Sequence, residues 1–410
     1  MDIIDKIWLR VSLFFLVSTA LLGFIIRLLP LQSVIPDSYY FGLLQSHSHT
    51  GFLGWVYMIL YFLLLKYFGR EELLKIKKTN IILTILAVFI LGMTISFPAT
   101  GYGLFSILFL SLFLIFSYYS LYYLYKNIDI KIKSTISYKF LIAGIIFYLM
   151  SSISPWLLGP IIAKGYKKTA LYYNDIFFYL HFLYNGFVTF AMVALFFLDL
   201  EHKKSTDKIM WSNLKKALYF LFTGTIFNYS ESLLWNKPGI IVHLLAFISS
   251  ILLIIGLYFL YKTYMNKYSY KAYPVLLIRL AISMYILKTT LQLLQSFPVF
   301  SNISYMLKSQ LIIGYIHLVT LGFITSFILA FLIKSKLLSK NKYLDWGIIF
   351  FIIGFALTEI ILFIQGLLLW GSISFFTPYY AFSMMIASAF LLIGFIFILI
   401  SSFSSREQYY

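Results

Sequence analysis

The sequence predicts an all-α, polytopic membrane protein with twelve membrane-spanning helices. Hydrophobic residues make up 61% of its 410 residues, charged residues make up 11%, and the mean hydropathy is +0.91. A soluble domain could not keep that much apolar surface away from water. A helix needs about 20 apolar residues to cross the hydrocarbon core, and the chain offers twelve such stretches. Residues 1–410 are therefore expected to form a single transmembrane domain.

The expected spans follow one another with short polar connections. None of these connections is long enough to fold by itself. The chain contains no cysteine, which excludes disulfides, iron–sulfur clusters and covalently attached haem. The expected spans are residues 7–29, 41–65, 80–98, 102–125, 138–158, 172–198, 215–235, 239–261, 272–296, 309–333, 345–370 and 379–403.

The distribution of cations predicts the orientation of these spans. Of the 32 Lys and Arg, 24 lie at the termini or in loops after even-numbered spans, and five lie in loops after odd-numbered spans. Cytoplasmic loops carry the excess of Lys and Arg, so both termini are expected in the cytoplasm of a bacterial-type inner membrane. The net charge of +18 then reflects topology and contact with the lipid bilayer rather than with nucleic acid.

Five of the six histidines lie near the outer ends of even-numbered spans. His47 and His49 are on the second span, His181 on the sixth, His243 on the eighth and His317 on the tenth. Ligating side chains are costly inside a bilayer, so a layer of them at one depth indicates a functional site. His49 and His317 are both about eight residues from the outer end, or about 12 Å deep. Two imidazoles at one level can ligate a haem iron from both sides.

Histidines on the second and tenth of twelve spans form the core pattern of the haem–copper oxidase superfamily, which includes nitric oxide reductases and NnrS-type membrane proteins. The run from His47 to Phe52 resembles the His-x-His of NnrS-type proteins, and its His49 begins a His-Thr pair like that of the reductases. The run from His317 to Gly322 is similar to the NnrS-type His-x-x-Thr-x-Gly. The resemblance implies an oxidase subunit I-like bundle in which His49 and His317 bind a low-spin haem b.

The chain departs from the catalytic members of this family at the second metal site. The run from Gly224 to Tyr229 replaces their Gly-Thr-x-His-His-Tyr motif, so that Asn228 stands at a metal-ligand position. Tyr315 stands two residues before His317, where the ligand of a high-spin haem is expected. The dinuclear centre therefore looks dismantled, and conventional oxygen reduction is not expected.

His181 and His47 are the candidates for an unconventional second metal site. His181 keeps the metal-binding position of the sixth span, but Asn185 replaces the glutamate of the reductases' His-x-x-x-Glu-Gly. His47 lies two residues from His49, about 200° around a helix, so the two cannot serve one ligand plane. His47 can instead face His181 and Asn228. Such a group could hold copper, iron or zinc, and a satisfied polar contact is the alternative.

Other polar residues are expected at the same outer level. Arg27 can pair with haem propionates, or its side chain can reach the interface. Glu231 and Lys288 are expected to pair, because a pair is cheaper in a membrane than either charge alone. His243 either belongs to this polar layer as a functional residue or only forms an ordinary interhelical hydrogen bond. These side chains define a possible polar cavity, whose candidate members are Asn185, Asn228, Glu231, His243, Lys288, Gln292 and Tyr315.

Two kinds of function follow from the sequence. In the first, the protein binds haem b and transfers electrons or handles nitric oxide, with a redox partner or respiratory-chain subunits as partners; a second metal would make it an oxidoreductase. In the second, it is a non-catalytic accessory subunit or a haem-free transporter, and the histidines only form hydrogen bonds. The haem content of the purified protein distinguishes the two.

Overall fold

The computed structural model describes residues 2–31, 37–203, 207–265, 274–301, 308–373 and 377–404. Helices account for nearly all of these residues, and across them the only β-type pairing is an isolated bridge between Gly69 and Ile128. The prediction of an all-α protein is confirmed. Residues 272 and 273, at the start of the ninth expected span, lie outside the described residues.

The described chain contains eleven helices that are long and apolar enough to cross a membrane. The protein is therefore an integral membrane protein in contact with the lipid bilayer. The expected span at 215–235 is not among the eleven. It folds as α10 (Lys208–Phe227) followed by the 3-10 helix η5 (Asn228–Asn236), and both ends of this segment are polar, with Lys215 and Lys216 near one end and Glu231 near the other.

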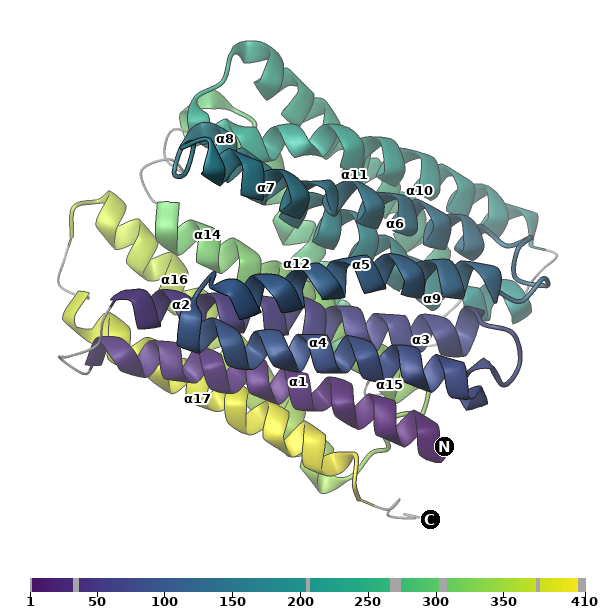
Figure 1. Cartoon of the computed structure of the whole chain (residues 1–410). Coiled ribbons are helices and arrows are strands. Elements are labelled where there is room, and N and C mark those ends of the chain that lie inside the picture. The colour runs from purple at the N-terminus through teal and green to yellow at the C-terminus, as the bar shows by residue number, and fades with distance from the viewer. Residues whose placement is uncertain are drawn as a thin grey trace. The chain divides into compact units, whose positions relative to one another are not determined.

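The chain forms two compact units. Unit 1 comprises residues 1–128 and 310–410, and unit 2 comprises residues 129–309. The helices of unit 1 in Figure 1 are α1 (Ile3–Leu28), α2 (Asp37–His49), α3 (Met58–Phe68), α4 (Lys77–Thr100), α5 (Leu104–Lys126), α14 (Lys308–His317), α15 (Ser326–Lys334), α16 (Lys342–Trp370) and α17 (Thr377–Ser401). Short helical segments join them, namely η1 (Leu29–Leu31), η2 (Thr50–Tyr57), η3 (Leu73–Lys75) and η6 (Leu318–Thr325).

Polar contacts show that successive spans of unit 1 run in opposite directions. At one end, Lys66 Nζ lies 2.8 Å from Asp5 Oδ2, which joins the end of the second span to the start of the first. At the same end, Arg10 donates to the carbonyl of Ser402 at 2.9 Å. At the other end, Tyr102 donates to Gln45 Oε1 at 2.9 Å. The first end is the cytoplasmic one predicted from the charges, and we call the second the outer end.

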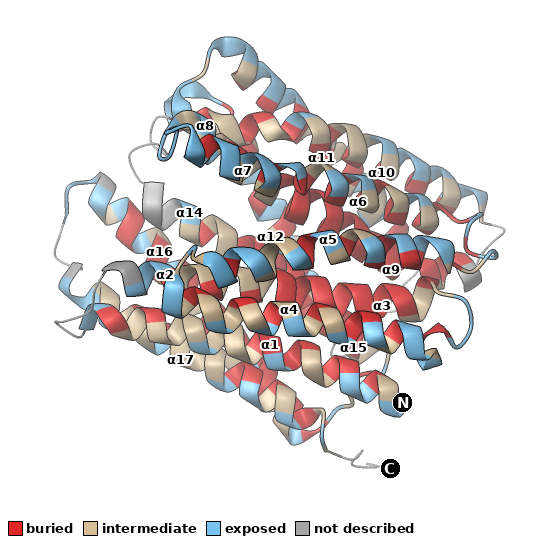
Figure 2. Ribbon diagram, viewed as in Figure 1, coloured by how far each residue is buried: buried red, intermediate tan, exposed pale blue. Residues whose placement is uncertain are grey.

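The second span is buried around its whole circumference at its centre. Every residue from Met58 to Leu65 in α3 is at most 1% exposed, and Figure 2 shows α3 as buried along most of its length. The span also passes through η2, where glycines allow close packing. A Cβ at Gly54 would lie 2.8 Å from the ring of Phe15 in α1. Span two is thus a central helix of unit 1, whereas α4 and α5 expose many apolar side chains as lipid-facing helices do.

Unit 2 is built of α6 (Ile136–Ser151), α7 (Ile153–Ala163), α8 (Ala170–Leu180), α9 (Thr189–Lys203), α10, α11 (Ile240–Met265) and α12 (Pro274–Gln295), with η4 (His181–Val188) between α8 and α9. The carboxylate of Glu201 accepts hydrogen bonds from the backbone N–H groups of Ile136 and Ser137, both at 2.7 Å. Those N–H groups lack partners within α6 because they belong to its first turn, so this buried carboxylate caps α6 and fixes it against α9.

Candidate functional sites

His47 and His49 of unit 1 point to different neighbours. His47 Nδ1 lies 2.9 Å from the carbonyl oxygen of Thr19 in α1. His49 Nδ1 lies 2.8 Å from the carbonyl of Gln45 in its own helix, and its ring stacks on Phe97 of α4 with centroids 4.6 Å apart. The two rings therefore point to different sides of the helix, as expected for residues two apart on a helix.

The hydrogen bonds of these two histidines show which ring nitrogen carries the hydrogen. A carbonyl oxygen can only accept, so Nδ1 carries the hydrogen in both rings. Nε2 then keeps its lone pair in each case. A histidine that ligates a metal has this arrangement, because a backbone carbonyl bonded to one ring nitrogen orients the other. His47 and His49 therefore both have a nitrogen available for coordination.

His317 lies at the end of α14, close to Arg27 of α1. The charge of Arg27 acts on both His317 and His47, and His47 also interacts electrostatically with His317. His317 Nδ1 is buried and has no hydrogen-bond partner among the described residues. Arg27 itself forms no ion pair within the described part of the chain. Unit 1 thus brings a cation without an acidic partner and an unsatisfied imidazole to one place. Tyr315, two residues before His317, is half-buried on the same helix.

The second and tenth spans lie side by side in unit 1. The indole N–H of Trp55 donates to Thr325 Oγ1 at 3.0 Å, and both residues are buried. Further along, the rings of Tyr67 and Phe331 pack edge to face at 5.4 Å. Trp55 comes eight residues after His47, and Thr325 comes eight residues after His317. The two spans run in the same direction, so the contact at Trp55 and Thr325 places His47 and His317 at similar depths, with His49 two residues further along its helix.

Glu359 of α16 is a buried acid on the face that packs against α14. It is 8% exposed, and neither carboxyl oxygen has a hydrogen-bond partner in the described part of the chain. A Cβ at Gly314 would lie 3.8 Å from its Oε2, which places the carboxyl one turn from His317 along α14.

Three spans with histidines change from α- to π-helical geometry at the histidine. The π-helical segments are η2, which follows His49, η4, which begins at His181, and η6, which follows His317. In each segment, the backbone N–H of the first residue after it donates to the carbonyl oxygen five residues earlier. In η6, for example, the N–H of Ser326 donates to the carbonyl of Leu321. Such segments are rare, and they occur frequently at functional sites. All three share a histidine followed five residues later by glycine and an aromatic residue, a repeat that sequence reasoning missed and could have found.

In unit 2, both ring nitrogens of His181 are used in hydrogen bonds. Nε2 lies 2.8 Å from the carbonyl of Thr225 and therefore carries the hydrogen, while Nδ1 accepts from Asn185 Nδ2 at 3.2 Å. His181 is 1% exposed. A metal could bind this ring only if one of these hydrogen bonds were broken. Asn185 here holds the imidazole in place.

Asn228 occupies the centre of a second hydrogen-bonded group in unit 2. Its Nδ2 donates to Ser249 Oγ at 3.1 Å, and its Oδ1 accepts from Gln292 Nε2 at 2.9 Å. Asn228 is completely buried, and these bonds join η5, α11 and α12. The residue at the expected metal-ligand position is thus a structural amide whose hydrogen bonds are satisfied by protein groups.

Glu231 and Lys288, which the sequence suggested as partners, are both buried near this group but form no contact ion pair. They are 6% and 1% exposed, and they interact electrostatically. Yet Lys288 Nζ and Glu231 Oε2 have no hydrogen-bond partner within the described chain, and the ion pairs found there are Lys66–Asp5 and Lys75–Glu72. The ammonium group lies 5.0 Å from the ring centroid of Tyr285, and Ser250 donates to Glu231 Oε1 at 3.2 Å. The helix positions hold the two charged groups near each other without direct contact.

His243 of α11 resembles the histidines of unit 1 rather than His181. Its Nδ1 lies 2.8 Å from the carbonyl of Ser296, which leaves the lone pair on Nε2. In the described residues no group of three or more His, Cys, Asp or Glu side chains is arranged to hold a metal ion. His47 belongs to unit 1 and His181 and Asn228 to unit 2, so their expected grouping around a second metal stays a prediction.

No protein-family model matches the sequence, and no curated protein matches it.

Proposed function

We propose that this protein binds one low-spin haem b in unit 1, between His317 and His49, and transfers electrons or handles nitric oxide in a bacterial-type cytoplasmic membrane. The proposal includes a twelve-span bundle of the haem–copper oxidase type, in which α10 and η5 together form the seventh span. The observation that carries it is the buried Nδ1 of His317, which has no hydrogen-bond partner in the described residues and feels the charge of Arg27, a cation without an acidic partner there.

The residues of unit 1 fit this group in three respects. His49 has its Nδ1 hydrogen on a backbone carbonyl, which leaves Nε2 to coordinate iron. The side-by-side packing at Trp55 and Thr325 supports similar depths for the two ligands. The guanidinium of Arg27 would pair with a haem propionate, for which its planar donor geometry is suited. Haem, when bound, would supply one-electron chemistry.

His47 is the alternative second ligand. It also has a free Nε2, it lies at the depth of His317, and His317 interacts electrostatically with it rather than with His49. The two choices cannot both hold for one haem, because His47 and His49 point to opposite sides of their helix. Substituting each histidine separately decides between them.

The test is an optical and pyridine-haemochrome spectrum of the purified protein, oxidised and reduced, after expression with ample haem. We expect about one haem b per chain with a six-coordinate spectrum. His317→Ala and His49→Ala should abolish that spectrum, whereas His243→Ala should leave it unchanged. His243 is the matched control because it is a buried histidine of unit 2 with the same kind of backbone hydrogen bond.

Three outcomes would contradict parts of the proposal. A colourless wild-type protein would exclude the haem. Loss of the spectrum in His47→Ala but not in His49→Ala would transfer the ligand role to His47. Equal loss in His243→Ala would show that the substitutions act through misfolding, and a melting curve of each variant measures that directly.

The second candidate function is passage of a proton or a small polar solute through unit 2, in a haem-free transporter or an accessory subunit. The observation that favours it is the buried charged pair Glu231 and Lys288, which leaves one carboxyl oxygen and the ammonium without hydrogen bonds. Ionisable residues inside a membrane commonly mark solute or proton pathways. A colourless protein whose Glu231 and Lys288 are both needed for uptake into proteoliposomes would support this function.

A further inference from the structure

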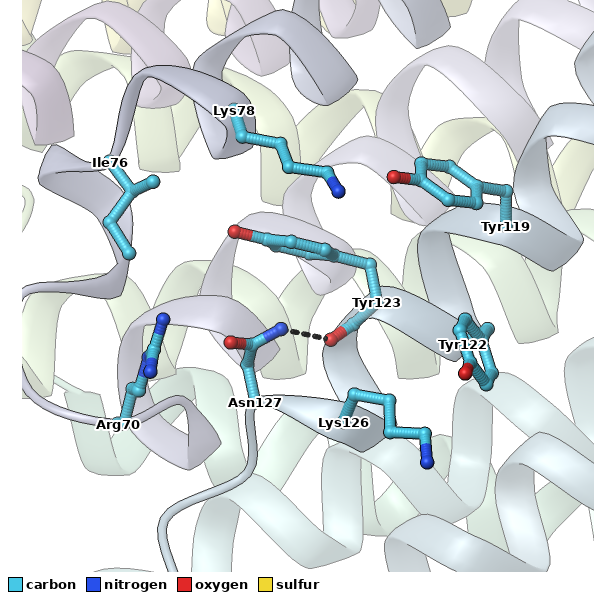
Figure 3. Close-up of a pocket in the computed structure, with 8 residues that line it drawn as sticks. All are labelled: Arg70, Ile76, Lys78, Tyr119, Tyr122, Tyr123, Lys126 and Asn127. Atoms are coloured by element: carbon cyan, nitrogen blue, oxygen red, sulfur yellow. Dashed lines mark hydrogen bonds between the residues drawn. The ribbon is translucent and has the colours of Figure 1, made fainter.

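We propose that unit 1 carries a binding site for the headgroup of an anionic phospholipid, in a pocket at its cytoplasmic end. A cavity of about 350 Å³ opens where the loop after α3 meets the start of α4 and the end of α5. Figure 3 shows this pocket, with Lys78 extending between Tyr119 and Tyr123, and with Arg70 and Lys126 on the side of Asn127.

The charge of the pocket selects an anion. Arg70, Lys78 and Lys126 line it, and no acidic residue does. None of the three cations forms an ion pair with a described residue, although the neighbouring Glu72 pairs with Lys75 at 2.6 Å. Three cations around one cavity repel each other unless an anion joins them. A phosphate group provides that charge and accepts hydrogen bonds from guanidinium and ammonium groups.

The walls of the pocket are held in place before any ligand binds. The Lys78 ammonium lies 5.7 Å and 5.6 Å from the ring centroids of Tyr119 and Tyr123, and that of Lys126 lies 5.6 Å from Tyr122. Tyr123 is fixed by a hydrogen bond of 2.9 Å between its hydroxyl and Thr79 Oγ1. These rings restrain two long, flexible cations, which lowers the entropy lost on binding.

Backbone contacts hold the third cation near the other two. The N–H of Arg70 donates to the carbonyl of Asn127 at 2.8 Å, and Gly69 forms a bridge with Ile128. Asn127 Nδ2 in turn donates to the carbonyl of Tyr123 at 2.8 Å. These bonds attach the loop after the second span to the end of α5. The backbone that carries Arg70 is therefore held in place at the pocket.

The position of the pocket favours a lipid over a free phosphate. It lies at span ends, where tyrosines form the interfacial belt and lipid phosphates are found. Apolar side chains exposed on the adjoining helices continue from it toward the membrane centre, including Ile81 on α4 and Ile115 on α5. Acyl chains could cover these side chains while the headgroup enters the pocket.

The experiment measures binding of dioleoyl-phosphatidylglycerol to the purified, delipidated protein by native mass spectrometry, with dioleoyl-phosphatidylcholine for comparison. We expect the Arg70→Gln, Lys78→Gln, Lys126→Gln triple variant to bind phosphatidylglycerol at least fivefold more weakly, and Lys126→Gln alone to weaken it less. The matched control is Lys336→Gln, Lys340→Gln, Lys342→Gln, which removes three exposed cations from another loop on the same predicted side.

Each result decides the proposal. A loss confined to the pocket variants supports it. An equal loss in the control would overturn it, because surface charge alone would then explain binding. Thermal stabilisation by inorganic phosphate equal to that by phosphatidylglycerol would overturn the lipid assignment and leave a free-phosphate site. The single Lys126 variant keeps the test decisive if the triple variant does not fold.

Discussion

Lys288 and Glu231 illustrate how a membrane protein can hold opposite charges near each other without direct contact. Each is buried, each acts on the other electrostatically, and Lys288 also acts on His181. Their side chains leave Nζ and one carboxylate oxygen without hydrogen bonds within the described residues. A charge inside a membrane is costly unless another charge compensates it, so each member of this pair should depend on the other.

The dependence predicts non-additive effects of substitution. Glu231→Gln and Lys288→Met should each lower the melting temperature of the detergent-purified protein, because each leaves an uncompensated buried charge. The double variant should lose less stability than the two single variants lose together. The difference, which is the coupling free energy, should be about 0.5–3 kcal/mol.

The control for this cycle is the exposed pair of Lys75 and Glu72, whose nitrogen and oxygen lie 2.6 Å apart. Glu72→Gln should cause no measurable change, since solvent screens an exposed pair. Strictly additive losses at 231 and 288 would show that the two charges do not compensate each other.

Residue types and spacing predicted the pairing of these charges but not its geometry. Lys288 and Glu231 were expected to be partners because both are charged and near the outer level. Whether two side chains touch depends on the rotation of α12 and η5 about their axes. Packing sets that rotation, and no local pattern reports it. The same reason explains why the hydrogen bond of His47 to Thr19 and the electrostatic interaction of His317 with Arg27 could not be predicted.

At the scale of elements, the π-helical segments are the feature that links sequence to site. In η4, the glycine that follows His181 by five residues lets α6 approach closely. A Cβ at Gly186 would lie 2.5 Å from the Cβ of Phe147, whose ring also packs against Phe182, Phe190 and Phe222. A methyl group at this position therefore cannot fit unless α6 or η4 moves.

This contact predicts that Gly186→Ala destabilises the protein by about 1–3 kcal/mol, the cost of overpacking a dense core. A melting curve in detergent measures the effect. Gly159→Ala is the matched control, because Gly159 is exposed on α7 and nothing lies within 4 Å of its added Cβ. It should be neutral or slightly stabilising. Equal effects of the two substitutions would contradict the packing explanation.

Hydropathy predicted where the helices lie but not where they change type. Apolar runs long enough to span a bilayer specify helices because backbone groups in lipid must bond within their own segment. The change from α to π geometry at His49, His181 and His317 adds one residue to a turn. Hydropathy is averaged over a whole span and does not register such a change.

At the scale of the molecule, orientation is the property that can be measured most directly. The chain has no cysteine, so single cysteines introduced at exposed positions can be labelled without background. Ser134 follows the fourth expected span, Tyr166 follows the fifth and Asn236 follows the seventh, and all three are exposed.

The twelve-span topology predicts the labelling pattern in cells with an accessible inner membrane. A membrane-impermeant maleimide should label Tyr166→Cys and Asn236→Cys from the outer side, and Ser134→Cys only after permeabilisation. The Asn236 result tests the seventh expected span, which is not among the eleven long apolar helices of the described chain. Protection of Asn236→Cys from the outer reagent would show that α10 does not cross the membrane.

The sequence by itself determined that this is an all-helical integral membrane protein, because hydropathy is a local property that adds up along the chain. It also predicted that His47, His49 and His317 lie near the same end of their helices, whereas the side-by-side packing of those helices came from the tertiary structure. Only the tertiary structure decided which ring nitrogens are available. Those of His181 are both used by Thr225 and Asn185, whereas His47 and His49 keep Nε2 free. A hydrogen-bond partner is supplied by whichever backbone or side chain packing brings near, often from a distant part of the chain.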